Sequence, residues 1–278
     1  MQHIVVATDF SNNAYSALFY AKQLLRGSPC TFYLLHVYNE HTPVKTQRLA
    51  KDVMEQLRDE SYEGLENFYH KIQLDCEDPN HKIQLLSKQG DLMLHLGEII
   101  KRKALNLVVM GNKGSSELKA ILAGSNTLRA IDQITDCPIL IVPKEIDFKG
   151  PKNISFVTAY SRWYTPELFE PLLFFAKLCD AKIRVMQVIA EKELASHQKI
   201  NRRILLKHLE HVNPSVHWMP LYKSKAFVIR EFLKELHIDV LVMARYEHDF
   251  LERLTHEPVL KRVAFDLDIP FLIIPCEN

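Results

Sequence analysis

The chain contains an internal repeat, and this repeat constrains the fold more than any other feature of the sequence. Residues 3–11 (HIVVATDFS) resemble residues 153–161 (NISFVTAYS) at a constant offset of 150. The halves also end alike, because 105–144 (LNLVVMGN…DCPILIVPK) matches 238–276 (IDVLVMAR…DIPFLIIPC). We therefore expect two copies of one unit, in domains 1–145 and 151–278, and 278 residues suit two domains. The charged Gly-Pro stretch KEIDFKGPK (144–152) is typical of a linker.

Strand-like and helix-like segments alternate within each copy. In the first copy, short apolar runs typical of buried strands lie at 4–8, 31–37, 82–90, 105–111 and 138–143. Helical periodicity covers 11–25, 46–70, 91–103 and 125–135, and Asp91 is an acid at a helix start. Strands that alternate with helices form parallel sheets with helices on both faces. The sequence therefore predicts an α/β protein with two tandem, doubly wound, mostly parallel sheets.

Composition and charge exclude several classes of function. Lys plus Arg (35) nearly balances Asp plus Glu (34), so no overall field favours nucleic acid or an anionic membrane. The apolar runs fall well short of the roughly 20 residues of a membrane-spanning helix. The five cysteines are scattered, odd in number and without a CxxC pair, as is typical of reduced cytosolic thiols. We expect a cytoplasmic protein that binds neither nucleic acid nor membrane.

Three of the eight glycines lie within residues 110–127 (MGNKGSSELKAILAGSNT). Gly111 and Gly114 follow a strand, and ligands of doubly wound sheets bind beyond the carboxyl ends of strands. Gly124 then precedes a helix, whose first N–H groups favour phosphate, with Ser125 and Thr127 as further hydroxyl donors. The spacing fits neither a P-loop nor GxGxxG. Two interpretations stay open: a phosphate-binding segment, or a tight turn followed by a helix cap.

The spacing G-x2-G-x9-G-S after a strand ending in VVM resembles the nucleotide-binding signature of the universal stress protein family. Residues 4–11 (IVVATDFS), 34–37 (LLHV) and 136–143 (DCPILIVP) resemble that family's first, second and closing strands. The resemblance covers residues 1–144, and the second half follows it in outline. It implies a tandem member of the family, with five-stranded Rossmann-like sheets of the adenine nucleotide α-hydrolase type.

The resemblance also implies a site for ATP or AMP in the first domain, where Mg²⁺ can accompany the nucleotide and neutralise its phosphates. In that site an acid and a backbone segment contact adenosine, the glycine segment surrounds ribose and phosphates, and two buried residues line the cleft. A lysine inside the glycine segment is a further phosphate partner. The residues are Thr8, Asp9, Val37, Met110, Gly111, Lys113, Gly114, Gly124, Ser125 and Asn126. Plainer interpretations stay open: Asp9 as a helix N-terminal acid, Val37 as a core residue and Lys113 as a solvated lysine.

The second copy lacks the corresponding residues. Ala159 stands in place of Asp9, and Ala244 in place of Gly111. The stretch THEPV (255–259) replaces AGSNT, and nearby acids would repel phosphate. We therefore expect a degenerate, structural second domain. Its aromatic residues Tyr160, Trp163 and Tyr164 either fill the former cleft or contact a partner.

The closing strands, 138–143 and 270–275, are short, apolar and bounded by prolines. Single domains of the resembled family pair through such edge strands, so we expect the two domains to pair within one chain, and a homodimer stays open.

Catalytic and metal-binding patterns are absent from the sequence. There is no GxSxG motif, and His248 and His256 are about 12 Å apart on a helix, too far to share one ion. His36 on its apolar strand is expected to be a core histidine whose hydrogen bonds are satisfied.

The leading hypothesis is a stress protein that binds nucleotide. The alternatives are a slow ATP-hydrolysing or adenylyl-transferring enzyme and a nucleotide-free scaffold.

Overall fold

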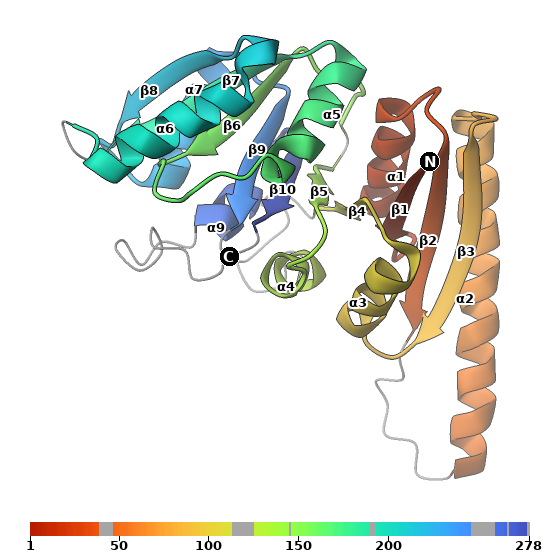
Figure 1. Cartoon of the computed structure of the whole chain (residues 1–278). Coiled ribbons are helices and arrows are strands. Elements are labelled where there is room, and N and C mark those ends of the chain that lie inside the picture. Colours follow the sequence, from red (N-terminus) through yellow and green to blue (C-terminus); the bar gives the residue numbers. More distant parts are fainter. Residues whose placement is uncertain are drawn as a thin grey trace. The chain divides into compact units, whose positions relative to one another are not determined.

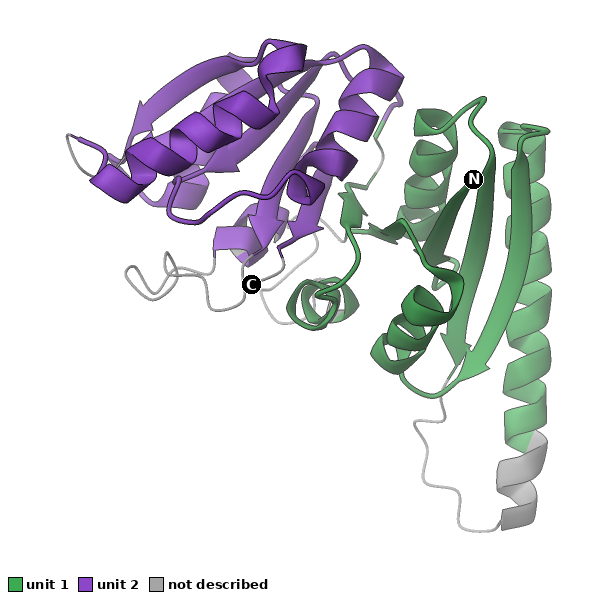
Figure 2. Cartoon of the chain, in the orientation of Figure 1, with its two compact units in different colours: residues 1–113, 124–146 green, residues 114–123, 147–278 purple. Residues whose placement is uncertain are grey.

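The computed structural model describes residues 1–38, 47–112, 125–144, 146–189, 193–245, 259–265 and 267–276. Among the expected site residues, Lys113, Gly114 and Gly124 lie outside these ranges. The described residues fall into two compact units, one of residues 1–112 and 125–146 and one of residues 147–276 (Figure 2).

The first unit is a parallel sheet with helices between its strands (Figure 1). Its strands are β1 (Gln2–Ala7), β2 (Cys30–Tyr38), β3 (His81–Gln89), β4 (Leu107–Gly111) and β5 (Ile139–Val142). Its helices are α1 (Asn12–Leu24), α2 (Gln47–Asp75), α3 (Leu92–Lys103) and α4 (Ser125–Gln133). The strand order is β3-β2-β1-β4-β5, and each neighbouring pair is parallel. The order reverses between β1 and β4, which is the switch point of a doubly wound sheet.

The second unit repeats this topology. Its strands are β6 (Asn153–Thr158), β7 (Lys182–Ile189), β8 (Ser215–Pro220), β9 (Val240–Arg245) and β10 (Phe271–Pro275). The described helices are α5 (Glu170–Cys179), α6 (Ser196–His208), α7 (Lys225–Glu235) and α9 (Val259–Phe265), with short 3-10 turns at Glu167–Phe169 and Glu210–Val212. The order β10-β9-β6-β7-β8 is parallel throughout and corresponds to β5-β4-β1-β2-β3. The predicted α/β class with mostly parallel sheets is confirmed.

The central strands are buried because their residues are apolar on both faces. Val5 and Val6 in β1 and Val108 and Val109 in β4 have no exposed surface, as expected for strands covered by helices on both sides. Helix α1 packs against β4 and β5, and α2 packs against β2 and β3. Within the described ranges, no helix is both long enough and apolar enough to cross a membrane.

Candidate functional site

Most of the expected site residues lie at one edge of the first unit's sheet. Parallel strands end at the same edge, and the residues in question follow β1, end β2 and β4, or begin α4. Thr8 and Asp9 come directly after β1, and Val37 is the second-last residue of β2. Met110 is buried in β4, where it lies in register with Ile141 of β5. This edge contains the switch point, where ligands of doubly wound sheets bind.

The turn after β1 holds the Asp9 side chain at the start of α1. The Thr8 hydroxyl accepts a hydrogen bond from Phe10 N at 3.0 Å, and Phe10 has the positive φ of 62°. Asp9 Oδ1 accepts from Ser11 N at 3.1 Å and from the Ser11 hydroxyl, and Ser11 caps α1. Asp9 is exposed, and within the described part of the chain its hydrogen bonds all use Oδ1. The Asp9 carboxylate therefore orients Ser11 at the start of α1 through Oδ1, and its Oδ2 stays available at the carboxyl edge of the sheet.

The backbone of Val37 faces a position that β1 does not fill. The last β1–β2 register pair is Ala7 with Leu35, and Thr8 N donates to Leu35 O at 2.9 Å. In a parallel strand the N–H and C=O of one residue point to the same side, and residues alternate between sides. Val37 therefore presents both groups on the β1 side, as Leu35 does, but beyond the end of β1. Val37 is only half-buried, so this donor–acceptor pair stands at the open edge.

Gly111 is required by the close approach of another backbone. A Cβ on this residue would lie 2.5 Å from Asn13 O and 2.6 Å from Asn13 C, in the first turn of α1. Gly111 is not among the described glycines with positive φ, which are Gly27 and Gly90. At Gly111 itself, which ends β4, glycine is therefore required by this contact and not by a left-handed backbone, and the rest of the proposed turn lies outside the described ranges. The missing Cβ brings the end of β4 against the start of α1.

Helix α4 begins at this edge and is bound to the end of β4. Ser125 is its first residue, and Asn126 is exposed in its first turn. Thr127 is buried, and its hydroxyl donates to Gly111 O at 3.3 Å. The expectation that Thr127 offers its hydroxyl to a ligand is therefore corrected, because that donor holds the helix. The first N–H groups of α4 remain the groups suited to an anion.

An ion pair between Asp91 and Arg129 was not predicted from the sequence. Arg129 Nη2 on α4 lies 2.6 Å from Asp91 Oδ2, and hydrogen bonding to Arg129 is the main cause that lowers the pKa of the carboxyl. Asp91 Oδ1 caps α3, accepting from Met93 N at 2.9 Å and Leu94 N at 3.2 Å, as its position at a helix start predicted. Nothing in the spacing of the two residues indicates the pairing, which depends on how α3 and α4 pack.

His36 is a satisfied histidine, as expected from its strand. Its Nδ1 pairs with Ser61 Oγ at 2.8 Å, and Ser61 Oγ pairs with Ser87 Oγ at 2.7 Å. The His36 ring centroid is 4.3 Å from that of Phe10, and burial lowers the pKa of the imidazole. The side chain is therefore committed to packing between β2, β3 and α2.

In the second unit, side chains of α6 bind the corresponding turn. Gln198 Nε2 donates to Ala159 O and Asn201 Nδ2 donates to Tyr160 O, both at 2.9 Å. Tyr160 has φ of 53°, which matches Phe10, and its N donates to the Thr158 hydroxyl at 3.0 Å. Here an alanine replaces the exposed acid, and the carbonyls of the turn are occupied.

The three aromatic residues near this turn have different roles. Tyr160 and Tyr164 are buried, and the Tyr164 hydroxyl pairs with Thr158, so these two side chains fill the interior. Trp163 is 63% exposed and does not fill the former cleft. Of the residues in place of MGNKG (243–247) and AGSNT (255–259), only 243–245 and Val259 lie within the described ranges.

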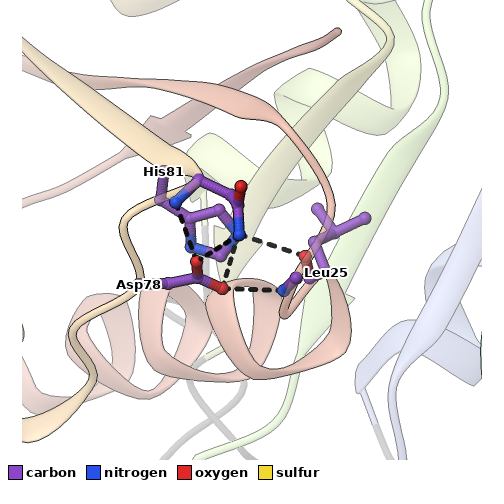
Figure 3. A network of polar contacts seen from close by, with 5 residues as sticks. Leu25, Asp78 and His81 are labelled. Atoms are coloured by element: carbon purple, nitrogen blue, oxygen red, sulfur yellow. Dashed lines mark hydrogen bonds and ion pairs between the residues drawn. The ribbon is translucent and has the colours of Figure 1, made fainter.

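A second polar cluster lies at the opposite, amino-terminal edge of the first sheet (Figure 3). Asp78 Oδ2 accepts from Gly27 N at 2.7 Å, and His81 Nε2 lies 3.1 Å from Leu25 O. Backbone hydrogen bonds from Gly27 and Asn80 lower the pKa of Asp78 to about 2. Among the described residues there is no group of three or more His, Cys, Asp or Glu side chains that could hold a metal ion. This cluster therefore joins the turn before β2 to the turn before β3 through hydrogen bonds.

Comparison with known proteins agrees with this geometry. A family model described as the universal stress protein family matches residues 1–143. The universal stress protein MJ0577 of Methanocaldococcus jannaschii is 27% identical over 154 residues, which cover 51% of this chain and 94% of the relative.

Solved structures resemble either nearly the whole chain or about half of it. A universal stress protein from Archaeoglobus fulgidus has a TM-score of 0.68 at 15% identity, over 98% of this chain and 97% of that one. A universal stress protein solved in complex with cAMP covers 46% of this chain and 100% of its own, at 16% identity and a TM-score of 0.36. The first of these likenesses shows the fold of both units.

Proposed function

Because the chain belongs to the universal stress protein family, we propose that its first unit binds an adenine nucleotide, ATP or AMP, in a cytoplasmic stress protein. One observation carries the proposal. The carboxyl edge of the first sheet presents the exposed carboxylate of Asp9, the backbone N–H and C=O of Val37, and the N-terminus of α4. Another member of the family has been solved with cAMP, which is also an adenine nucleotide.

The base and ribose suit the groups near β1 and β2. Adenine carries an amino donor beside a ring-nitrogen acceptor, and the C=O and N–H of Val37 complement this pair. Asp9 Oδ2 is an acceptor for an N–H or O–H of the adenosine, and the buried Thr8 and Met110 close the floor. Recognition of this kind uses few polar groups in a mostly apolar surrounding.

The phosphates suit the end of β4 and the start of α4. Backbone N–H groups at a helix N-terminus and its partial positive charge favour anions. In this proposal Gly111, Ser125 and Asn126 contact ribose and phosphates together with Lys113, Gly114 and Gly124. ATP enters with Mg²⁺, which neutralises phosphate charge without a ligand set from the protein.

We also propose that the second domain, 151–278, is degenerate and structural, while 1–145 carries the nucleotide. Ala159 offers no carboxylate, and α6 occupies the carbonyls of Ala159 and Tyr160.

The two domains are proposed to pair through 138–143 and 270–275. β5 and β10 each end the strand order of their own unit, and both are short and apolar between prolines. Exposed apolar edges invite association, so each is expected to have a partner. Hydrogen exchange at these amides tests this. Intrachain pairing predicts protection that is independent of concentration, whereas a homodimer through these edges predicts protection that falls on dilution.

Isothermal titration with ATP and AMP, each with and without Mg²⁺, tests the nucleotide site. Gly124→Glu places a negative charge and a side chain where phosphate is expected, so it should abolish the heat of binding seen with the wild type. Gly150→Glu is the matched control, because nothing lies within 4 Å of a Cβ at Gly150. Equal heats in all three proteins would place the ligand elsewhere, and no heat in any of them would favour the scaffold. Steady release of phosphate or pyrophosphate from bound ATP would favour the enzyme.

A further inference from the structure

We propose that the Asp91–Arg129 ion pair positions α4 for nucleotide binding, so that affinity depends on two residues outside the expected contact set. This inference rests on the proposed function and adds to it a positioning element. Arg129 lies one helical turn after Ser125, on the same face of α4. Its partner Asp91 lies at the carboxyl end of β3, on the far side of β2 from the switch point.

The Asp91 carboxylate is oriented by hydrogen bonds that do not involve Arg129. Asp91 Oδ1 accepts from Met93 N and Leu94 N at the start of α3, which leaves Oδ2 directed at Arg129 Nη2 at 2.6 Å. Exposed ion pairs are usually weak, partly because two side chains must be ordered. Here the acid is ordered by its capping role, so mainly the arginine loses freedom when the pair forms.

Asp91 is also connected to β2, the strand whose Val37 backbone is proposed to bind adenine. Gly90, with φ of 119°, precedes Asp91, and Gly90 N donates to Tyr38 O at 3.0 Å. Tyr38 directly follows Val37 in β2. The ion pair therefore connects the end of β2, through Gly90 and Asp91, to α4.

The other connection of α4 leads to β4 and α1. Thr127 donates to Gly111 O, and Gly111 lies against the backbone of Asn13. Helix α1 in turn starts at the turn that holds Asp9. The helix is thus held on one side by a part-buried neutral hydrogen bond and on the other by an ion pair whose Arg129 and Asp91 side chains are 40% and 37% exposed. Loosening the ion pair leaves α4 attached but less well oriented.

A substitution that keeps the helix cap isolates this role. Asparagine caps helices as well as aspartate, so Asp91→Asn retains the acceptor for Met93 N and Leu94 N and removes the charge that holds Arg129. Arg129→Gln removes the same pair from the other side, and Arg129→Lys keeps the charge. Glu98→Gln is the matched control, because Glu98 lies on α3, is exposed and pairs within its own helix with His95.

ATP affinity is measured by titration and stability by thermal melting in these variants. We expect Asp91→Asn, Arg129→Gln and the double variant each to weaken ATP binding by the same factor, roughly two- to fivefold. Arg129→Lys should recover part of the loss, and the melting temperature and Glu98→Gln should stay close to the wild type. Unchanged affinity in Asp91→Asn would overturn the proposal. Tighter ATP binding would also overturn it, since Arg129 would then be a phosphate partner released from Asp91.

Hydrogen exchange separates this inference from the proposed function. If the wild type binds no nucleotide, the proposed function fails, and the amides of 125–133 still report on the ion pair. Faster exchange there in Asp91→Asn, but not in Glu98→Gln, supports positioning of α4. Equal exchange in both variants overturns it.

Discussion

At the scale of single residues, Gly111 is determined by the backbone of Asn13. A side chain at this position has to displace either β4 or the first turn of α1, because its Cβ would lie 2.5 Å from Asn13 O. We expect Gly111→Ala to lower the free energy of unfolding by roughly 1–3 kcal/mol, the usual cost of overpacking a tight site. Urea denaturation measures this cost.

Gly97→Ala provides the control for that experiment. Gly97 lies within α3, and nothing is found within 4 Å of a Cβ built on it. Replacing a helical glycine by alanine should raise the free energy of unfolding by roughly 0.5–1 kcal/mol. If Gly111→Ala were equally stabilising, the close approach of α1 to β4 would be refuted.

Lys22 is a second residue whose environment decides its behaviour. Its amine is fully buried in α1, has no hydrogen-bond partner among the described residues, and burial lowers its pKa. The unfolded chain therefore binds this proton more tightly than the folded chain, so stability is lost as pH falls below the ordinary lysine value. We expect Lys22→Met to raise the free energy of unfolding at pH 7 by roughly 1–3 kcal/mol. Lys152→Met, at an exposed lysine, should change it little.

The glycine spacing and the family resemblance predicted the candidate site residues but not the contacts that support them. Asp9 and Val37 were expected from the resemblance to the family's strands, and Gly111 from the position of its glycine segment after a predicted strand. The structure has all three at the carboxyl edge of the first sheet, since parallel strands end together. The Asp91–Arg129 pair and the bond from Thr127 to Gly111 were missed, because partners far apart in sequence are chosen by helix packing. The reason for Gly111 was also missed, since a flexible turn and a close backbone approach both require glycine.

At the scale of elements, periodicity predicted the strands well and the helix ends less well. Expected strands at 31–37 and 82–90 are found at Cys30–Tyr38 and His81–Gln89. The helix expected over 46–70 continues to Asp75, because Ile72 is still buried against the sheet amid charged neighbours. Apolar runs thus define strands directly, whereas a charged helix surface hides the last buried turn.

The turns at the amino-terminal edge depend on Asp78. Its buried carboxylate accepts from Gly27 N at 2.7 Å and Asn80 N at 2.9 Å, which joins the turn before β2 to the turn before β3. We expect Asp78→Ala to lower the free energy of unfolding by roughly 1.5–3 kcal/mol and to speed hydrogen exchange at these turns. Asp59→Ala, on the exposed face of α2, is the control and should have little effect. Comparable losses in both variants would contradict an anchoring role.

At the scale of the whole molecule, the two units show that the fold does not require the residues that are proposed to contact nucleotide. The strand orders match from end to end, yet the second unit has Ala159 in place of Asp9 and Ala244 in place of Gly111. Its turn after the first strand keeps the positive φ and the threonine bond seen in the first unit. The backbone turn is therefore a property of the fold. The exposed acid is an addition specific to the first unit.

Stability of the whole chain is expected to fall on mild acidification. Burial lowers the pKa of His36, His81 and His217, which lie in both units. Below the ordinary histidine value of about 6.5, the unfolded chain takes up these protons while the folded chain resists them, so the free energy of unfolding rises with pH. We expect a loss on the order of 1–2 kcal/mol between pH 7 and pH 5, measured by urea denaturation at each pH. A flat profile would mean that the three imidazoles accept protons in the folded chain as readily as in water. In that case the packing of His36 against Phe10 and of His81 between Asp78 and Leu25 would have to open near pH 6.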